Sequence, residues 1–150
     1  MSDDEFRDSG LPVDPDIDVR PAHLSVAVAV FLGGCAGGFS RYEIGRQWPS
    51  AAGHFPWDTF WINLSGAFAL AVLVTLLAGS PRPRWFLRPA VGTGFIGAYT
   101  TFSALVTSTD LLAVHGHVAV AVAYSIGSIV FGSASVLLGF QLARWIADHP

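Results

Sequence analysis

A chain of 150 residues that is 52% apolar and only 13% charged does not have the composition of an ordinary water-soluble domain. Its formal net charge is −3 and its eight basic residues, all arginine, are scattered, so it offers no broad basic surface for nucleic acid. The single cysteine, Cys35, excludes an internal disulfide and a multi-thiolate metal site.

The N-terminal segment is acidic and polar. Seven of the eleven acidic residues lie in the first 18 positions, where Pro12 and Pro15 interrupt the chain. Low hydrophobicity with a net charge predicts an acidic disordered tail over residues 1–22. The tail has no basic start followed by an apolar stretch, so we do not expect a signal peptide. Residues 23–150 are predicted to form one all-α membrane domain with four transmembrane helices.

The first apolar run extends from Leu24 to about Ser40 and ends at Arg41. Four glycines within it form two interleaved G-x-x-x-G pairs, the pattern that lets helix backbones approach closely in lipid. The pairs are Gly33 with Gly37 and Gly34 with Gly38. A connector that contains two prolines and a glycine is expected over residues 43–58.

The second and fourth apolar runs each contain isolated polar residues. Asn63 stands out in the second run, residues 59–80, and Tyr124 and Ser128 lie one helical turn apart in the fourth, residues 117–143. All five tryptophans lie at or near the ends of runs, where an interfacial aromatic belt is expected.

The third apolar run, Pro89 to Thr109, is long enough to cross a bilayer but rich in glycine and threonine. These residues lower helix propensity, so a break is predicted near Gly97 to Thr101. Backbone groups freed by a break at membrane depth need a protein partner or an aqueous cavity. The broken third helix is therefore the segment around which we expect the function to be organised.

No acidic or basic residue occupies the middle of any run, which excludes the ion pairs of a proton-coupled carrier and the catalytic groups of an intramembrane enzyme. What remains is a set of neutral polar side chains. This set comprises Asn63, Thr100, Thr101, Ser103, Tyr124 and Ser128. Amide and hydroxyl donors suit a small anion that must be bound weakly enough to leave, although the same groups also join membrane helices to one another.

Three segments resemble, in order and spacing, the Fluc (CrcB) family of fluoride channels. They are GGCAGGFSRY (33–42), INLSGAF (62–68) and GFIGAYTTFS (94–103). The resemblance covers all four runs. It implies an antiparallel, dual-topology dimer of four-span subunits in the bacterial inner membrane, with two pores through which cytoplasmic fluoride leaves passively and which confer fluoride resistance.

The resemblance also implies roles for individual residues. Asn63 is similar to the family's pore asparagine and Phe102 to the first phenylalanine facing the anion, with Thr101, Ser103, Tyr124 and Ser128 completing the polar track. Gly97 and Thr100 match the break whose backbone carbonyls, one pair from each subunit, hold a central structural sodium ion. Arg41 matches an arginine at the membrane edge, where a vestibule or structural role is expected.

Two positions depart from the family pattern. Leu105 stands in place of a second pore phenylalanine, and Ser108 stands where an acidic residue is usual. These departures leave open a heterodimer with an oppositely oriented paralogue, in which each chain contributes part of one pore or this chain is a non-conducting partner. A small multidrug-exporter-like carrier, also four-span and dimeric, is a separate alternative. The carrier would need a membrane-embedded carboxylate, which the runs lack.

Overall fold

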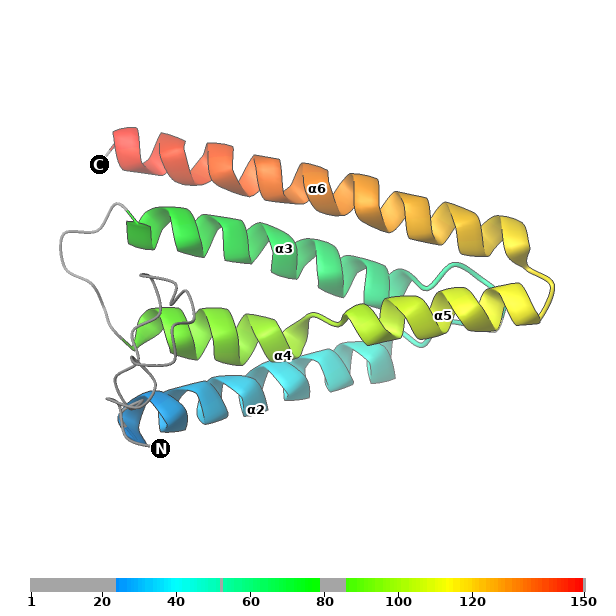
Figure 1. Cartoon of the computed structure of the whole chain (residues 1–150), viewed down its shortest axis with the longest axis horizontal. Coiled ribbons are helices and arrows are strands. Elements are labelled where there is room, and N and C mark those ends of the chain that lie inside the picture. The colour runs from blue at the N-terminus through cyan, green and yellow to red at the C-terminus, as the bar shows by residue number, and fades with distance from the viewer. Residues whose placement is uncertain (1–23, 52, 79–85, 150) are drawn as a thin grey trace, which may run out of the picture.

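The computed structural model describes residues 24–51, 53–78 and 86–149, which form helices joined by turns and contain no β-strand. The predicted acidic tail, residues 1–22, lies outside the described residues. The elements in chain order are α2 (Leu24–Gln47), α3 (Trp57–Ala78), the π-helical segment η1 (Arg88–Ile96), α4 (Gly97–Tyr99), α5 (Phe102–Val114) and α6 (Val118–Asp148) (Figure 1).

Four helical segments are long and apolar enough to cross a membrane, the third being η1, α4 and α5 taken together. They have 22 to 31 residues and mean hydropathies of 1.2 to 2.0. At about 1.5 Å per residue, each can span a hydrocarbon layer of about 30 Å. The prediction of an all-α chain with four membrane spans is confirmed for the described residues.

The end of the first helix differs from the prediction. The apolar run ends near Arg41, but α2 continues to Gln47, so the expected connector over 43–58 starts too early. Glu43 and Arg46 lie three residues apart on the added turn and form an ion pair of 3.0 Å. Such i,i+3 pairs stabilise a helix in water, so the helix extends past the apolar residues. Hydropathy marks where the lipid ends, not where the helix ends.

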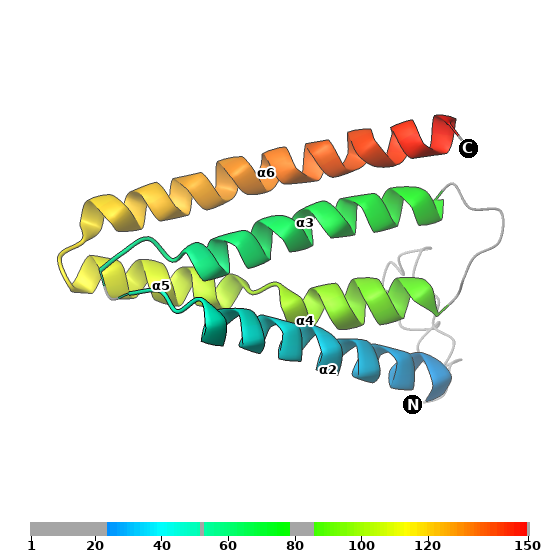
Figure 2. The same cartoon turned by 180° about the vertical axis from the view of Figure 1, so that it is seen from behind.

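The helices pack in two pairs: α3 runs along α6, and α2 runs along η1 and α4 (Figures 1 and 2). The predicted glycine pair Gly33 and Gly37 lets α2 approach the backbone of η1 closely. A Cβ atom at Gly33 would lie 2.1 Å from the Ala90 carbonyl oxygen, and one at Gly37 would lie 2.1 Å from that of Phe95. Gly38 faces open space instead, so only one of the two predicted pairs packs within the chain.

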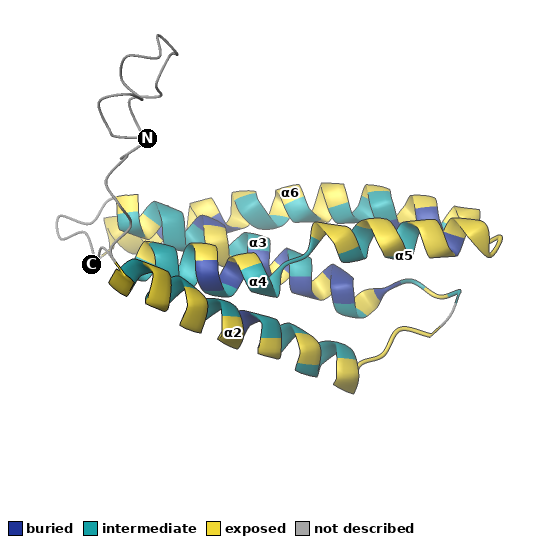
Figure 3. Cartoon of the chain, turned by 60° about the horizontal axis from the view of Figure 1, so that its bottom comes forward, coloured by how far each residue is buried: buried dark blue, intermediate teal, exposed yellow. Residues whose placement is uncertain are grey.

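The buried core is small. Phe60, Leu64 and Tyr124 form its centre, between α3 and α6, and the half-buried Phe55 and Leu105 pack against them. Along α2 only Gly37 is buried, and Figure 3 shows exposed residues along the outer sides of the helices. So much exposed apolar surface is unfavourable in water and suits contact with lipid or with a second chain.

The backbone of the third span is extended at two threonines. Thr100 (φ −80°, ψ 156°) and Thr101 (φ −152°, ψ 119°) lie between α4 and α5. Figure 1 shows this segment as a thin link between the two helices, near the middle of the bundle. The Thr101 hydroxyl caps α5 by accepting a hydrogen bond of 3.2 Å from the Ala104 N–H.

The connector between α2 and α3 docks on the turn between α5 and α6. Gly53 has φ +78°, and a Cβ atom there would lie 2.5 Å from Nε2 of His117. We expect Gly53→Ala to destabilise the protein by about 1 kcal/mol or more, because alanine disfavours this backbone and the imidazole must move. Thermal unfolding of the purified protein in detergent measures the loss.

Gly116→Ala is the matched control for Gly53→Ala. Gly116 has φ +84°, but no atom lies within 4 Å of the position that a Cβ atom would take there, so alanine tests the backbone cost alone. A larger loss for Gly53→Ala than for Gly116→Ala isolates the contact with His117. Equal losses would mean that this contact contributes nothing to the docking of the connector.

Candidate functional site

The extended segment of the third span is held by one side chain of α3. The Asn63 amide donates a hydrogen bond of 3.0 Å to the Thr101 carbonyl oxygen, and its Oδ1 accepts one of 2.8 Å from the Thr101 N–H. Asparagine can bond a backbone in this way because its side chain offers a donor and an acceptor side by side. Asn63 therefore replaces Gly97 as the partner of the Thr101 N–H and gives a second donor to the Thr101 carbonyl, which is the N-cap carbonyl of α5.

The extended segment leaves the carbonyl groups of residues 97–100 without their regular helical donors, and those of Gly97 and Thr100 are two of the four. In a continuous helix the Thr101 N–H would donate to the Gly97 oxygen and the Ala104 N–H to the Thr100 oxygen. Here the first N–H bonds Asn63 and the second bonds the Thr101 hydroxyl. Gly97 and Thr100, the two residues matched to a sodium site, thus lose their regular donors on the same short segment.

A hollow of about 290 Å³ lies beside this segment, and we call it the break hollow. Its lining includes Asn63, Gly66, Ile96, Thr100, Thr101 and Phe102. Phe102, the first residue of α5, is 78% exposed. An aromatic ring presents a positive edge, which can face an anion without forming an ion pair. The break hollow brings together three of the predicted pore residues, Asn63, Thr101 and Phe102.

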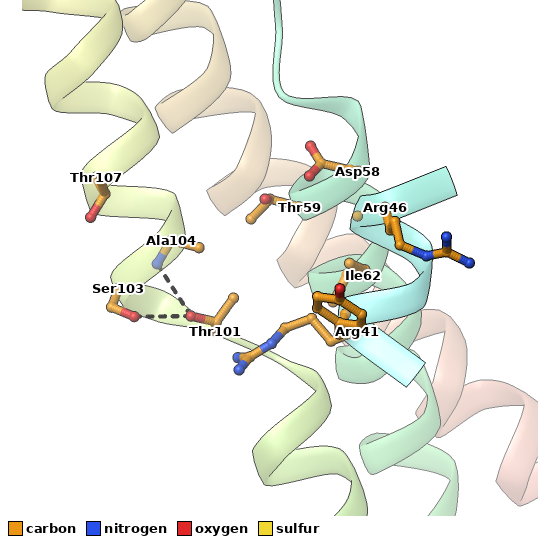
Figure 4. A pocket seen from close by; sticks show the side chains of 11 residues that line it. Arg41, Arg46, Asp58, Thr59, Ile62, Thr101, Ser103, Ala104 and Thr107 are labelled. Carbon is orange, nitrogen blue, oxygen red and sulfur yellow. Dashed lines mark hydrogen bonds between the residues drawn. The ribbon is translucent and has the colours of Figure 1, made fainter. Parts of the chain in front are cut away.

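A larger hollow of about 630 Å³ opens on the other side of Thr101, and we call it the groove (Figure 4). It lies between the C-terminal end of α2, the first turns of α3 and the first turns of α5. Its lining includes Arg41, Arg46, Asp58, Thr59, Thr101 and Ser103. The hydroxyls of Thr101 and Ser103 lie 3.0 Å apart and bond each other. In Figure 4 the Arg41 side chain extends toward these hydroxyls. The predicted vestibule residue thus shares a hollow with two predicted pore residues.

Tyr124 and Ser128 lie elsewhere, inside the packing of α6, and line neither the break hollow nor the groove. Tyr124 is fully buried, with the Phe55 ring edge-on at 5.2 Å between ring centroids. The hydroxyls of both residues are buried, and within the described part of the chain neither makes a hydrogen bond of regular geometry, although Thr59 and Ser108 lie close to the Tyr124 hydroxyl. A buried hydroxyl without a partner is costly, so a polar ligand here would be stabilised.

Thr59 and Asp58 are two of the polar lining residues that were not among the predicted site residues. Thr59 is 8% exposed and lines the groove one helical turn before Asn63, so its four-residue spacing from Asn63 is a signal that could have identified it. Asp58 also lines the groove, but nothing in the sequence distinguishes it from an ordinary acidic residue in the first turn of a helix.

Donors for a transition metal do not gather in the described residues. Within residues 24–51, 53–78 and 86–149, no three His, Cys, Asp or Glu side chains form a group that could hold a metal ion. Carbonyl oxygens are hard donors, which suit sodium, and the freed Gly97 and Thr100 carbonyls are of this kind.

Comparison with known proteins finds one matching family and several similar proteins. The family described as "CrcB-like protein, Camphor Resistance (CrcB)" matches residues 28–140. A Streptomyces avermitilis protein named fluoride-specific ion channel FluC 3 is 43% identical over 119 residues, which are 79% of this chain and 58% of that protein. The Nocardia farcinica FluC 2 is 38% identical over 127 residues, which cover 85% of this chain and 91% of the relative. The Cutibacterium acnes FluC 1 is 41% identical over 120 residues, which cover 78% of this chain and 82% of the relative.

Proposed function

Because the chain belongs to the CrcB family, we propose that it is a passive fluoride-selective channel that exports cytoplasmic fluoride across the bacterial inner membrane. Hydrogen fluoride enters a cell as a neutral acid and ionises inside, so a selective passive path for the anion lowers the internal concentration. Such a path needs weak neutral donors and no catalytic group. The membrane-spanning helices supply the donors.

The observation that best supports this function is the pair of orphaned hydroxyls on α6. Tyr124 and Ser128 lie one helical turn apart, and each has a buried oxygen that makes no hydrogen bond of regular geometry among the described residues, with Thr59 and Ser108 nearest to that of Tyr124. A dehydrated fluoride ion accepts hydrogen bonds strongly but cannot be held as tightly by a hydroxyl as by an arginine. We infer that these hydroxyls replace part of its water shell during passage.

The other predicted pore residues would act at the break. Phe102 exposes its ring beside Asn63, and the hydroxyls of Thr101 and Ser103 face the groove. The first N–H groups of α5 also point toward this end of the helix, where an anion is favoured by the helix dipole. Arg41 at the groove attracts anions to the entrance without occupying the path.

We further propose a structural sodium ion at the freed carbonyls of Gly97 and Thr100. A hard cation takes about six oxygen ligands, and one chain supplies two here. A second, antiparallel copy related by a two-fold axis would supply the matching pair and would bury part of the exposed apolar surface. This dimer provides two equivalent paths, one on each side of the axis.

A heterodimer is the alternative that a specific observation favours. Leu105, at the position of the second pore phenylalanine, packs against the core of Phe60, Leu64 and Tyr124, so this chain presents one aromatic ring fewer to an anion. Streptomyces avermitilis has relatives named FluC 2 and FluC 3, which shows that one organism can hold several such chains. An oppositely oriented paralogue could complete the path.

The test is fluoride efflux from liposomes that contain this chain alone, followed with a fluoride electrode. We expect efflux of fluoride far faster than of chloride, and we expect Phe102→Ile to reduce it at least about tenfold, because an aliphatic side chain has no positive ring edge. Ile126→Leu, on the exposed side of α6, is the control and should leave efflux unchanged. Absence of efflux that is restored by a paralogue would establish the heterodimer, and absence under both conditions would refute the channel.

A further inference from the structure

Asp58 lies in the wall between two hollows. It belongs to the first turn of α3 and lines the groove on one side. On the other side it lines a hollow of about 330 Å³ between the α2–α3 connector and the α5–α6 turn, which we call the end hollow. The residues of the end hollow include Ser50, His54, Asp58, Thr59, Ser108 and His117. Among the described residues, Asp58 is the only carboxylate that lines either hollow.

The two oxygens of this carboxylate are fixed in different directions. Oδ1 accepts a hydrogen bond from the Ser50 hydroxyl in the connector. Oδ2 is directed toward α2, since a Cβ atom at Gly45 would lie 3.9 Å from it. Asp58 is half-buried, so its side chain is held at the wall of the groove instead of extending into solvent.

No arginine within residues 24–51, 53–78 and 86–149 neutralises this charge. Of the arginines in those residues only Arg46 forms an ion pair, with Glu43, so Asp58 and Arg41 share the groove without a salt bridge between them. Figure 4 shows Asp58 and Arg41 on opposite sides of Thr59, with the Arg41 side chain directed toward Thr101. The groove is therefore lined by two arginines, of which Arg46 is paired with Glu43 and Arg41 is not, and by one carboxylate that repels an approaching anion.

We propose that Asp58 limits the rate at which anions enter the groove, because its negative charge opposes the attraction that Arg41 exerts on them. The inference rests on the proposed fluoride function. A fixed carboxylate next to Thr59 raises the energy of an anion that passes along the wall, and this repulsion is strong only where salt does not screen it. Removing the charge should speed conduction at low ionic strength.

The experiment compares three variants by initial fluoride efflux at about 0.01 M and about 1 M inert salt, where the Debye lengths are about 30 Å and 3 Å. Asp58→Asn removes the charge but keeps an oxygen acceptor for Ser50. Ser50→Ala removes the hydrogen bond but keeps the charge. Asp110→Asn removes an exposed carboxylate of α5 that lines neither hollow. We expect Asp58→Asn to raise efflux about two- to fivefold at low salt and not at high salt.

Asp110→Asn should leave both the rate and its salt dependence as in the wild type, and Ser50→Ala, which keeps the carboxylate and its charge, should raise efflux less than Asp58→Asn does. If the wild type conducts and Asn63→Leu does not, the proposed function stands. An unchanged rate for Asp58→Asn at low salt would then overturn the inference about Asp58 without affecting the proposed function. An equal gain at both salt concentrations, or the same gain with Ser50→Ala, would also overturn it, because the effect would then come from the connector and not from charge. A wild-type chain that conducts no fluoride would overturn the proposed function together with the inference.

Discussion

We expect Asn63→Leu to abolish fluoride efflux and to lower the thermal stability of the protein. Leucine has nearly the same size but neither donates to the Thr101 carbonyl nor accepts from the Thr101 N–H. The Thr101 N–H would be left without a partner, at a cost of about 1–3 kcal/mol, and the Thr101 carbonyl would lose one of its two donors. The third span would lower this cost by rewinding toward a continuous helix, and the break hollow and the freed carbonyls would disappear.

Ser65→Ala is the matched control for Asn63→Leu. Ser65 lies on the same helix two residues further on, and its hydroxyl bonds the Trp61 carbonyl at 2.7 Å and the Tyr99 hydroxyl at 3.0 Å. Its loss removes a polar contact of α3 without touching Thr101, so efflux should persist. If Asn63→Leu retained both the wild-type rate and the wild-type unfolding temperature, Asn63 would not be what holds the extended segment.

The second large effect is expected for Gly37→Val. A Cβ atom at Gly37 would lie 2.1 Å from the Phe95 carbonyl oxygen and 3.0 Å from its Cα, and these are backbone atoms that cannot rotate away. α2 must therefore separate from η1 or lose its register along it. Overpacking of this kind costs about 3 kcal/mol, so we expect the protein to elute as aggregate from detergent and to give no efflux.

The neighbouring glycine offers the comparison within the same helix. Gly38 has no atom within 4 Å of an added Cβ, so Gly38→Val should leave the packing of α2 on η1 intact. Size-exclusion elution and thermal unfolding of the two variants measure the difference. Equal stability of Gly37→Val and the wild type would mean that α2 and η1 are further apart in the membrane than in the structure.

Much of the fold could be predicted because lipid imposes a simple rule. A span needs about 20 apolar residues, and the four runs satisfy this without help from tertiary contacts. The same rule fails where lipid ends. The last turn of α2 is stabilised in water by the ion pair of Glu43 and Arg46, and a hydropathy profile does not detect such a pair. The closeness of α2 and η1 was predictable from Gly33 and Gly37, but which of the two interleaved pairs faces the contact was not.

The site was less accessible to sequence reasoning because it depends on contacts between distant residues. Asn63 is conspicuous as an amide in an apolar run, yet its partner is a backbone group 38 residues away, which no spacing rule supplies. Asp58 resembles an ordinary acid at a helix start, and its significance comes only from the two hollows that meet beside it. The orphaned state of the Tyr124 and Ser128 hydroxyls likewise depends on their surroundings.

The bond pair between Asn63 and Thr101 has a consequence for how the protein is made. During synthesis α3 leaves the ribosome before the third span, so the amide is already in the membrane when the threonines arrive. A peptide of the third span alone lacks this partner, and its Thr101 N–H would return to the Gly97 oxygen as in any helix. The extended shape of Thr100 and Thr101 is thus acquired during insertion, through contact with a helix that was inserted earlier.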